Sequence, residues 1–263
     1  MNKTKIEWAD STWNVFSGCT KISPGCQSCY AGEAAERKRG TMAFPDGFDL
    51  TIRSHKLIEP YQLKQPSLVF VNSMSDFFLD SVPDELRDQM IDIMESTPRH
   101  EYLVLTKRAE EMLAYTRRRK LPKNFWAGVS IENQQYAYRA DLLRQVEAEV
   151  RFISAEPLLG PLDLDLTDIH WVIAGGESGK HLHDPVKRER RSLVRKDGKR
   201  WVPREDRMQW VRHLRDTCTS AGVAFFMKQW GGPTPKAGGN ELDGQTWLEY
   251  PRLPVGDRGH QAG

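Results

Sequence analysis

The sequence lacks several features that would place it in other protein classes. No apolar run approaches the roughly 18 residues that a membrane span needs. Lys and Arg number 38 against 36 Asp and Glu, so a net charge of +2 does not by itself demand a nucleic-acid partner. Four cysteines in 263 residues are too few for a disulfide framework. The N-terminus is polar and has no apolar signal-peptide core, so we expect a cytoplasmic protein.

The sequence does contain a series of short apolar runs. Hydrophobic residues make up 39% of the chain, enough for a sizeable core. The runs are continuous rather than alternating, which favours strands buried on both faces of a parallel sheet. They occupy residues 67–72, 102–106, 125–131, 150–154, 170–174 and 223–227, with a shorter candidate at 13–16.

Helical patterns lie between these runs. Apolar residues recur at helical spacing after Val82-Pro83-Asp84 and within residues 107–118, 133–146 and 207–221, where Gly222 is a stop signal. Alternating strands and helices predict an α/β fold, a partial or closed TIM-like (β/α) barrel, with an open doubly wound sheet as the alternative. We expect one domain over residues 1–230, with a basic insert at 180–207. A Gly/Pro-rich extension with a flexible end follows at 231–263.

Every proposed strand changes from apolar to hydrogen-bonding residues at its carboxyl end. In parallel α/β folds these ends meet at one edge and carry the functional residues. Some of these polar residues would instead be plain helix caps. Several carboxylates around one cavity would need cations to offset their repulsion, and Lys107, Arg108 and Lys228 come from the same rim. We expect catalytic roles for Glu132, Glu156 and Lys228, and cofactor-binding roles for Asn72, Ser73, Lys107, Ser130, Gly175, Gly176 and Glu177.

Three of the four cysteines, Cys19, Cys26 and Cys29, form a C-x6-C-x2-C loop. Thiolates at this density select zinc or an iron–sulfur cluster. A structural zinc site normally has four protein ligands, whereas three cysteines suit a 4Fe-4S cluster with one iron left open. A zinc site completed by His55 or another histidine is the alternative. Cys218 belongs to an amphipathic helical pattern and is expected to be a core residue.

The chain resembles a phage- and prophage-associated family known by phage gene-product names. The matching motifs, besides the cysteine loop, are IEW (6–8), TWN (12–14), SPG (23–25), VNSMSD (71–76), LTKR (105–108), GVSIEN (128–133), SAEPLLG (154–160) and KQWG (228–231). A three-cysteine loop after the first strand of an α/β barrel is also similar to the radical S-adenosylmethionine superfamily. The superfamily's usual spacing is C-x3-C-x2-C, and its Gly-Gly-Glu segment follows an early strand, whereas Gly175-Gly176-Glu177 follows a late one.

The superfamily resemblance implies a cluster whose open iron chelates S-adenosylmethionine, an electron donor for that cluster, and cleavage to a 5′-deoxyadenosyl radical. Together with the phage family and the basic insert, it points to a nucleic-acid or nucleotide substrate, and photoproduct lyases are the nearest functional analogy. The insert would track a phosphate backbone or be a solvated loop. The alternative function is a non-enzymatic, zinc- or cluster-stabilised phage accessory or nucleic-acid-binding module. A third is a hydrolase that uses Glu132, Glu156 and Glu177 without a cluster.

Overall fold

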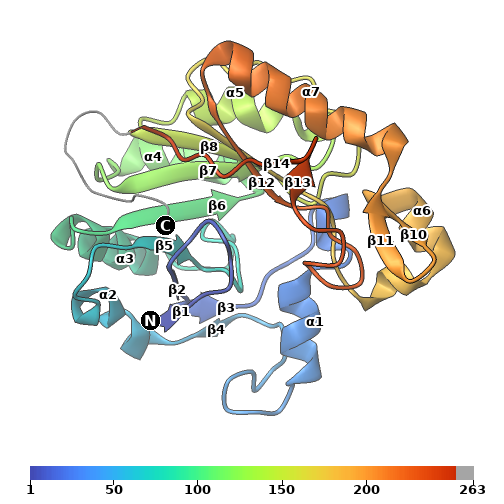
Figure 1. Ribbon diagram of the computed structural model, residues 1–263. Coiled ribbons are helices and arrows are strands. Elements are labelled where there is room, and N and C mark those ends of the chain that lie inside the picture. Colours follow the sequence, from blue (N-terminus) through green and yellow to red (C-terminus); the bar gives the residue numbers. More distant parts are fainter. Residues whose placement is uncertain (253–263) are drawn as a thin grey trace.

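The computed structural model describes residues 1–252, and its centre is an eight-stranded sheet (Figure 1). Seven strands run parallel in the order β2-β5-β6-β7-β8-β9-β12, and β1 pairs antiparallel with β2 at one edge. Their bounds are β1 Asn2–Lys3, β2 Ser11–Trp13, β5 Leu68–Val71, β6 Glu101–Thr106, β7 Phe125–Ser130, β8 Val150–Ala155, β9 Trp171–Gly175 and β12 Ala224–Gln229. Within the described residues the two edge strands do not pair, so the barrel is partial, as the alternation of strands and helices predicted.

Four helices cover the outer face of this curved sheet (Figure 1). They are α3 (Asp84–Ser96), α4 (Ala109–Arg118), α5 (Tyr138–Arg144) and α7 (Glu205–Ala221). The helix α3 begins directly after Pro83. The helix α7 ends at Ala221, directly before Gly222, whose φ of +68° is the left-handed conformation that glycine adopts without strain. No helix within residues 1–252 is long and apolar enough to cross a membrane.

The two-residue period of the strands separates two apolar cores. On β7, Ala127 and Val129 pack outward against the helices, whereas Trp126 faces the barrel interior. Phe152 fills the interior beside Gly128, where an added Cβ would lie 2.2 Å from its ring. The interior cluster consists of Trp8, Leu68, Phe70, Leu103, Trp126, Val150, Phe152, Trp171, Ile173 and Phe226. These side chains form one buried cluster inside the barrel, which we call the aromatic plug.

The first strand differs from the prediction of 13–16. It ends at Trp13 because the Asn14 side chain turns the chain away: its Oδ1 accepts hydrogen bonds from Met74 N at 3.1 Å and Ser73 Oγ at 3.2 Å. Residues Phe16–Ser17 form a separate strand, β3, which pairs antiparallel with β4 (Thr51–Ile52). The cysteine loop therefore begins beside the end of β5.

The basic insert has regular structure. It contains the helix α6 (Pro185–Arg191) and an antiparallel hairpin of β10 (Val194–Asp197) and β11 (Arg200–Pro203), at the right of Figure 1. The N-cap side chain of α6, Asp184, accepts a hydrogen bond from Val186 N at 2.8 Å.

Residues 231–252 pack beside β12. They include the short strands β13 (Glu241–Leu242) and β14 (Gln245–Thr246). Trp230 Nε1 donates to Glu241 O at 2.7 Å, and Met227 N donates to Trp247 O at 2.7 Å, which covers the exposed edge of β12. The end that we expected to be flexible falls mainly in residues 253–263, outside the described part of the chain.

Candidate active site at the cysteine loop

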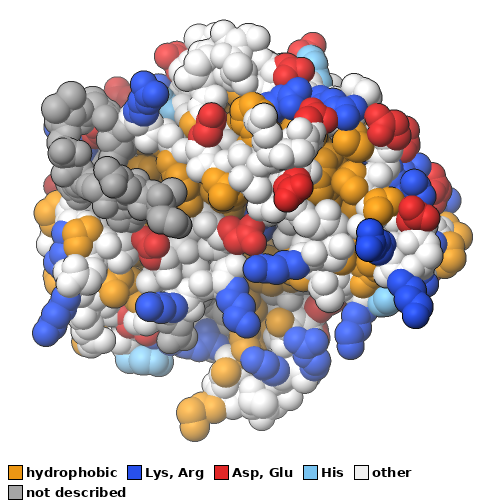
Figure 2. Space-filling view, viewed as in Figure 1, with side chains coloured by type: hydrophobic (Ala, Val, Ile, Leu, Met, Phe, Trp, Pro, Cys, Tyr) orange, Lys and Arg blue, Asp and Glu red, His pale blue; other side chains and the backbone are white. Residues whose placement is uncertain are grey.

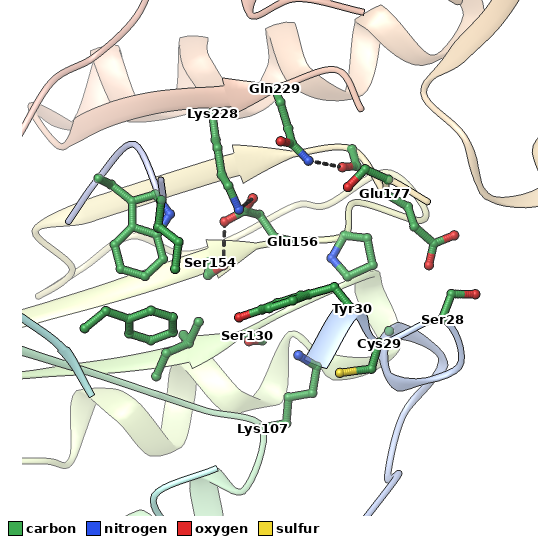
Figure 3. A pocket seen from close by; sticks show the side chains of 18 residues that line it. Ser28, Cys29, Tyr30, Lys107, Ser130, Ser154, Glu156, Glu177, Lys228 and Gln229 are labelled. Atoms are coloured by element: carbon green, nitrogen blue, oxygen red, sulfur yellow. Dashed lines mark hydrogen bonds and ion pairs between the residues drawn. The ribbon is translucent and has the colours of Figure 1, made fainter. Parts of the chain in front are cut away.

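A cavity of about 210 Å³ lies above the aromatic plug, at the carboxyl ends of the strands (Figure 3). Its polar lining follows from strand periodicity, because Ser130, Ser154 and Lys228 each lie two residues beyond an interior position of β7, β8 or β12. Other lining residues are Ile6, Trp8, Gly25, Ser28, Cys29, Tyr30, Phe70, Leu105, Lys107, Glu156, Pro157, Gly176, Glu177, Ser178 and Gln229. The ends of strands that are far apart in sequence thus line the same cavity.

An ion pair crosses this cavity. Lys228 Nζ lies 2.8 Å from Glu156 Oε1, and Ser154 Oγ donates to Glu156 Oε2 at 3.3 Å. Both charged side chains remain partly exposed to the cavity. Gly175 makes room for the carboxylate, since an added Cβ would lie 2.5 Å from Glu156 Oε1. Glu156 and Lys228 therefore meet in one cavity, in the space that Gly175 leaves.

The cysteine loop lies on the rim of the cavity. A 3₁₀ helix, η1 (Pro24–Cys26), turns the chain, and Cys29 is the N-cap residue of α1 (Tyr30–Arg37). Cys29 contributes to the cavity wall, whereas Cys19 and Cys26 are partly exposed elsewhere on the loop. The start of the loop is tied to the end of β5 by a hydrogen bond from Gly18 N to Met74 O at 3.0 Å.

Three charged side chains hold the loop, and each comes from a different part of the fold. The first is Arg108, after β6. Its Nη1 lies 3.7 Å from Cys19 Sγ, and its Nη2 donates to Thr20 Oγ1 at 2.6 Å. The Asp76 carboxylate anchors the same turn, because it accepts from Lys107 N at 3.0 Å and lies 3.5 Å from Arg108 Nη1.

The second is Glu132, which is fully buried and does not line the cavity. Its carboxylate accepts hydrogen bonds from Ser23 Oγ in the loop and from Arg139 Nη1 at 3.0 Å. Gly25 packs directly on it: an added Cβ would lie 2.5 Å from Glu132 Oε1. Lys107 Nζ approaches to 4.0 Å. Glu132 thus sits beneath the loop, away from the Glu156–Lys228 pair with which we expected it to share the cavity.

The third is Arg191, the last residue of α6. It pairs with Glu177 through Nε at 2.6 Å, and its Nη2 also donates to Pro24 O at 3.0 Å. Its Nη1 donates to Gln27 Oε1 at 3.0 Å. Glu177 is consequently occupied by protein donors, which include His181 Nε2 at 3.1 Å. The insert, which is remote from the cysteine loop in sequence, is therefore in direct contact with it.

The remaining predicted residues surround this rim. Asn72 is buried with φ +54°, and both polar atoms of its side chain are without a hydrogen-bond partner. Ser73 O accepts a hydrogen bond from Tyr30 Oη at 2.5 Å, which draws the Tyr30 ring across the cavity (Figure 3). Gly176 is required by close packing, because its Cβ would lie 2.1 Å from Trp230 O. Sequence reasoning assigned no site role to Tyr30, and only its position after Cys29 could have signalled one.

The three thiols of the cysteine loop are suitable ligands for zinc or an iron–sulfur cluster, but their sulfur atoms do not converge on one point. Among residues 1–252, no three His, Cys, Asp or Glu side chains converge closely enough to hold a metal ion. Cys19, Cys26 and Cys29 are nevertheless free, partly exposed thiols on one short loop. Burial, with the nearby Asp76 carboxylate, raises the pKa of Cys19 to about 11, so a metal would have to displace its proton. Cys218 is fully buried in α7, as expected of a core residue.

Comparisons with known proteins agree with the fold. Two solved structures of spore photoproduct lyase variants resemble it, one of them with a dinucleoside spore photoproduct and the other with a tyrosine replaced by phenylalanine. Each has a TM-score of 0.53 and 12% sequence identity, and covers 88% of this chain and 78% of that chain. No curated protein matches the sequence. A family model described as "Protein of unknown function (DUF5131)" matches residues 3–203 and 197–251, and the chain belongs to this family.

Proposed function

We propose that this protein is a radical-SAM-like enzyme that binds a 4Fe-4S cluster and S-adenosylmethionine and acts on a nucleic acid or nucleotide. The observation that carries the proposal is the position of the three thiols. They lie on one loop after the first parallel strand of a partial barrel, with Cys29 in the wall of a cavity at the strand ends. The likeness to spore photoproduct lyase supports the same fold. We also propose that the protein is phage-associated, and this part of the proposal rests on the sequence motifs alone.

The donor chemistry of the three loop thiols fits such cofactors, which would bind only once these thiols converge. Cys19, Cys26 and Cys29 would ligate three irons, and the cluster, reduced by an external electron donor, would supply the electron that cleaves S-adenosylmethionine. Ser130, Ser154 and Lys107 offer polar groups on the cavity wall for the cofactor.

The Glu156–Lys228 pair supplies one acceptor and one donor within the same cavity. It would orient a bound polar group or move a proton between ligand and protein. Glu132 and Glu177, whose carboxylates are taken by protein donors, would act by holding the cysteine loop. We therefore retain Glu156 and Lys228 as candidate catalytic residues and give Glu132 a positioning role.

The substrate class rests on the surface beside the site. Figure 2 shows Lys and Arg side chains over α1 and over the insert around α6, on the same face of the molecule. Lys196, Lys199 and Arg200 on the hairpin are exposed. Such cations bind phosphate backbones of either DNA or RNA. One of the structurally similar lyases holds a dinucleoside spore photoproduct. A thymine photoproduct is therefore the first substrate that we propose to test.

The test is anaerobic purification followed by reconstitution with iron and sulfide. We expect a brown protein with about four irons per chain. With S-adenosylmethionine and a reductant it should release 5′-deoxyadenosine, and an oligonucleotide that contains a thymine photoproduct should be altered. A colourless protein with one zinc per chain and no cofactor cleavage would contradict the proposal. That outcome would favour a non-enzymatic, zinc-stabilised binding module.

A further inference from the structure

We propose that Arg191 is a positioning residue for the cysteine loop, so that the basic insert is a built-in part of the proposed metal site. The inference deepens the proposed function and rests on it for the metal readout alone. It assigns to one arginine of the insert a role different from phosphate binding.

The guanidinium of Arg191 joins two parts of the chain with all three of its nitrogens. Nε and Nη2 contact the Glu177 carboxylate at 2.6 and 2.5 Å. Nη2 also donates to Pro24 O and Nη1 to Gln27 Oε1, each at 3.0 Å. The planar fork of arginine allows these bonds to form together, which a lysine ammonium cannot reproduce.

On one side Arg191 is held by Glu177, which follows β9. The Glu177 side chain is 4% exposed and accepts a further hydrogen bond from His181 Nε2 at 3.1 Å. The C-terminus of α6 is fixed as well, because Arg207 Nη1 donates to Ser192 O at 2.8 Å. Charge-assisted hydrogen bonds are stronger than neutral ones, so the largely desolvated Arg191–Glu177 pair can hold the loop in place.

The loop-side contacts flank the thiols. Pro24 and Gln27 lie on either side of Cys26, and Cys29 follows two residues later. On its other side this segment rests on buried Glu132, which accepts from Ser23 Oγ. Arg191 and Glu132 thus contact the same turn from different parts of the fold. Cys19 is contacted separately, by Arg108. Loss of Arg191 should therefore loosen Cys26 and Cys29 without affecting Cys19.

The experiment measures thiol alkylation in the metal-free, full-length protein, with each cysteine quantified by mass spectrometry. In Arg191→Gln, which loses the hydrogen bonds to Pro24 O and Gln27 Oε1, Cys26 and Cys29 should react at least about tenfold faster. Tenfold is roughly the effect of a single lost charge-assisted hydrogen bond on local opening. The rate of Cys19 should not change. Arg191→Lys should restore part of the protection. The matched control is Arg190→Gln, at the exposed neighbouring position. Equal rates for Cys26 and Cys29 in Arg191→Gln and wild type would overturn the proposal.

A second variant guards against a folding defect. Gln27→Ala removes a loop-side acceptor and leaves the Arg191–Glu177 pair intact, so it should also speed alkylation of Cys26, at an unchanged melting temperature. An unchanged rate of Cys26 alkylation in this variant would count against a positioning role for Arg191. Metal affinity provides the second readout: Arg191→Gln should bind zinc or iron less tightly than Arg190→Gln. If the wild type binds no metal, the proposed function fails, and the alkylation rates still decide the role of Arg191.

Discussion

Lys228 Nζ lies 2.8 Å from Glu156 Oε1 inside the barrel, although Lys228 is on β12 and Glu156 follows β8, which is not its neighbour in the sheet. The β9 strand between them carries Gly175, and the absence of a side chain there leaves the space that the carboxylate fills. A small residue on the middle strand is thus what allows an acid and a base to meet across it.

This pair should show strong energetic coupling. Lys228→Met leaves the mostly buried Glu156 carboxylate without its cation, and Glu156→Gln leaves the ammonium unpaired. We expect each single change to lower the free energy of unfolding, and the double change to cost less than their sum by about 0.5–3 kcal/mol. Urea unfolding of the four proteins at pH 7 measures this difference. Strict additivity would mean that the pair is not formed in solution.

The four cysteines should fall into two classes. Replacing Cys19, Cys26 or Cys29 by Ala should abolish stable cluster loading, as measured by iron content and low-temperature EPR. Cys218→Ala should load normally and lower stability by about 1 kcal/mol, because it removes a buried core atom. Full loading of Cys26→Ala would contradict the assignment of the three-cysteine site.

Gly25 should tolerate no side chain. Its Cβ would lie 2.5 Å from Oε1 and 2.7 Å from Cγ of the fully buried Glu132, whose carboxylate is held by Arg139 Nη1 at 3.0 Å. Gly25→Ala should therefore displace the loop and reduce metal binding at least tenfold, a cost of about 1.4 kcal/mol or more.

Gly160→Ala is the matched control, because its added Cβ would meet its nearest neighbour, Asn133 Cβ, at 3.4 Å. Metal titration of both variants, with melting temperatures, provides the comparison. Equal metal binding by the two would show that the contact between Gly25 and Glu132 does not set the loop position.

Stability should fall as the solution becomes strongly alkaline. Burial raises the pKa of Cys19 from 9.0 to about 11 and that of Cys218 from 9.0 to about 12. Above pH 9 the unfolded thiols ionise while the folded ones keep their protons, so unfolding becomes progressively easier up to these raised values. In metal-free protein, the urea midpoint should drop between pH 8.5 and 11. The drop should be smaller in Cys218→Ala, and an identical pH profile in that variant would contradict this account.

The exposed hairpin should supply the salt-dependent part of nucleic-acid binding. Lys196, Lys199 and Arg200 are exposed, unlike Arg191, which serves the cysteine loop. Replacing these three by Ser should weaken binding and flatten the log–log salt slope by roughly 0.7–0.9 per lost phosphate contact. Fluorescence anisotropy with labelled DNA and RNA over a salt series measures the slope, and cluster content should not change. A wild-type protein without salt-sensitive affinity would turn the search to small-molecule substrates.

The sequence by itself determined the local framework. Continuous apolar runs marked the six main strands of the barrel, and Gly222 marked the end of α7, because these signals depend on neighbouring residues. The cysteine spacing identified the loop. The common edge of parallel strands predicted that Glu132, Glu156 and Lys228 meet in one cavity, and the structure brings the last two together there.

Tertiary structure alone decided which charged residues serve the cavity and which serve the loop. Glu132 and Glu156 follow adjacent strands and look equivalent in sequence, yet the first lies buried under Ser23 and the second faces the cavity. Arg191 reaches Gln27 across 164 positions of the chain. Hydrophobic periodicity is local, whereas the partner of a charge depends on how distant segments dock. No pattern along the chain could therefore show that the insert and the cysteine loop meet.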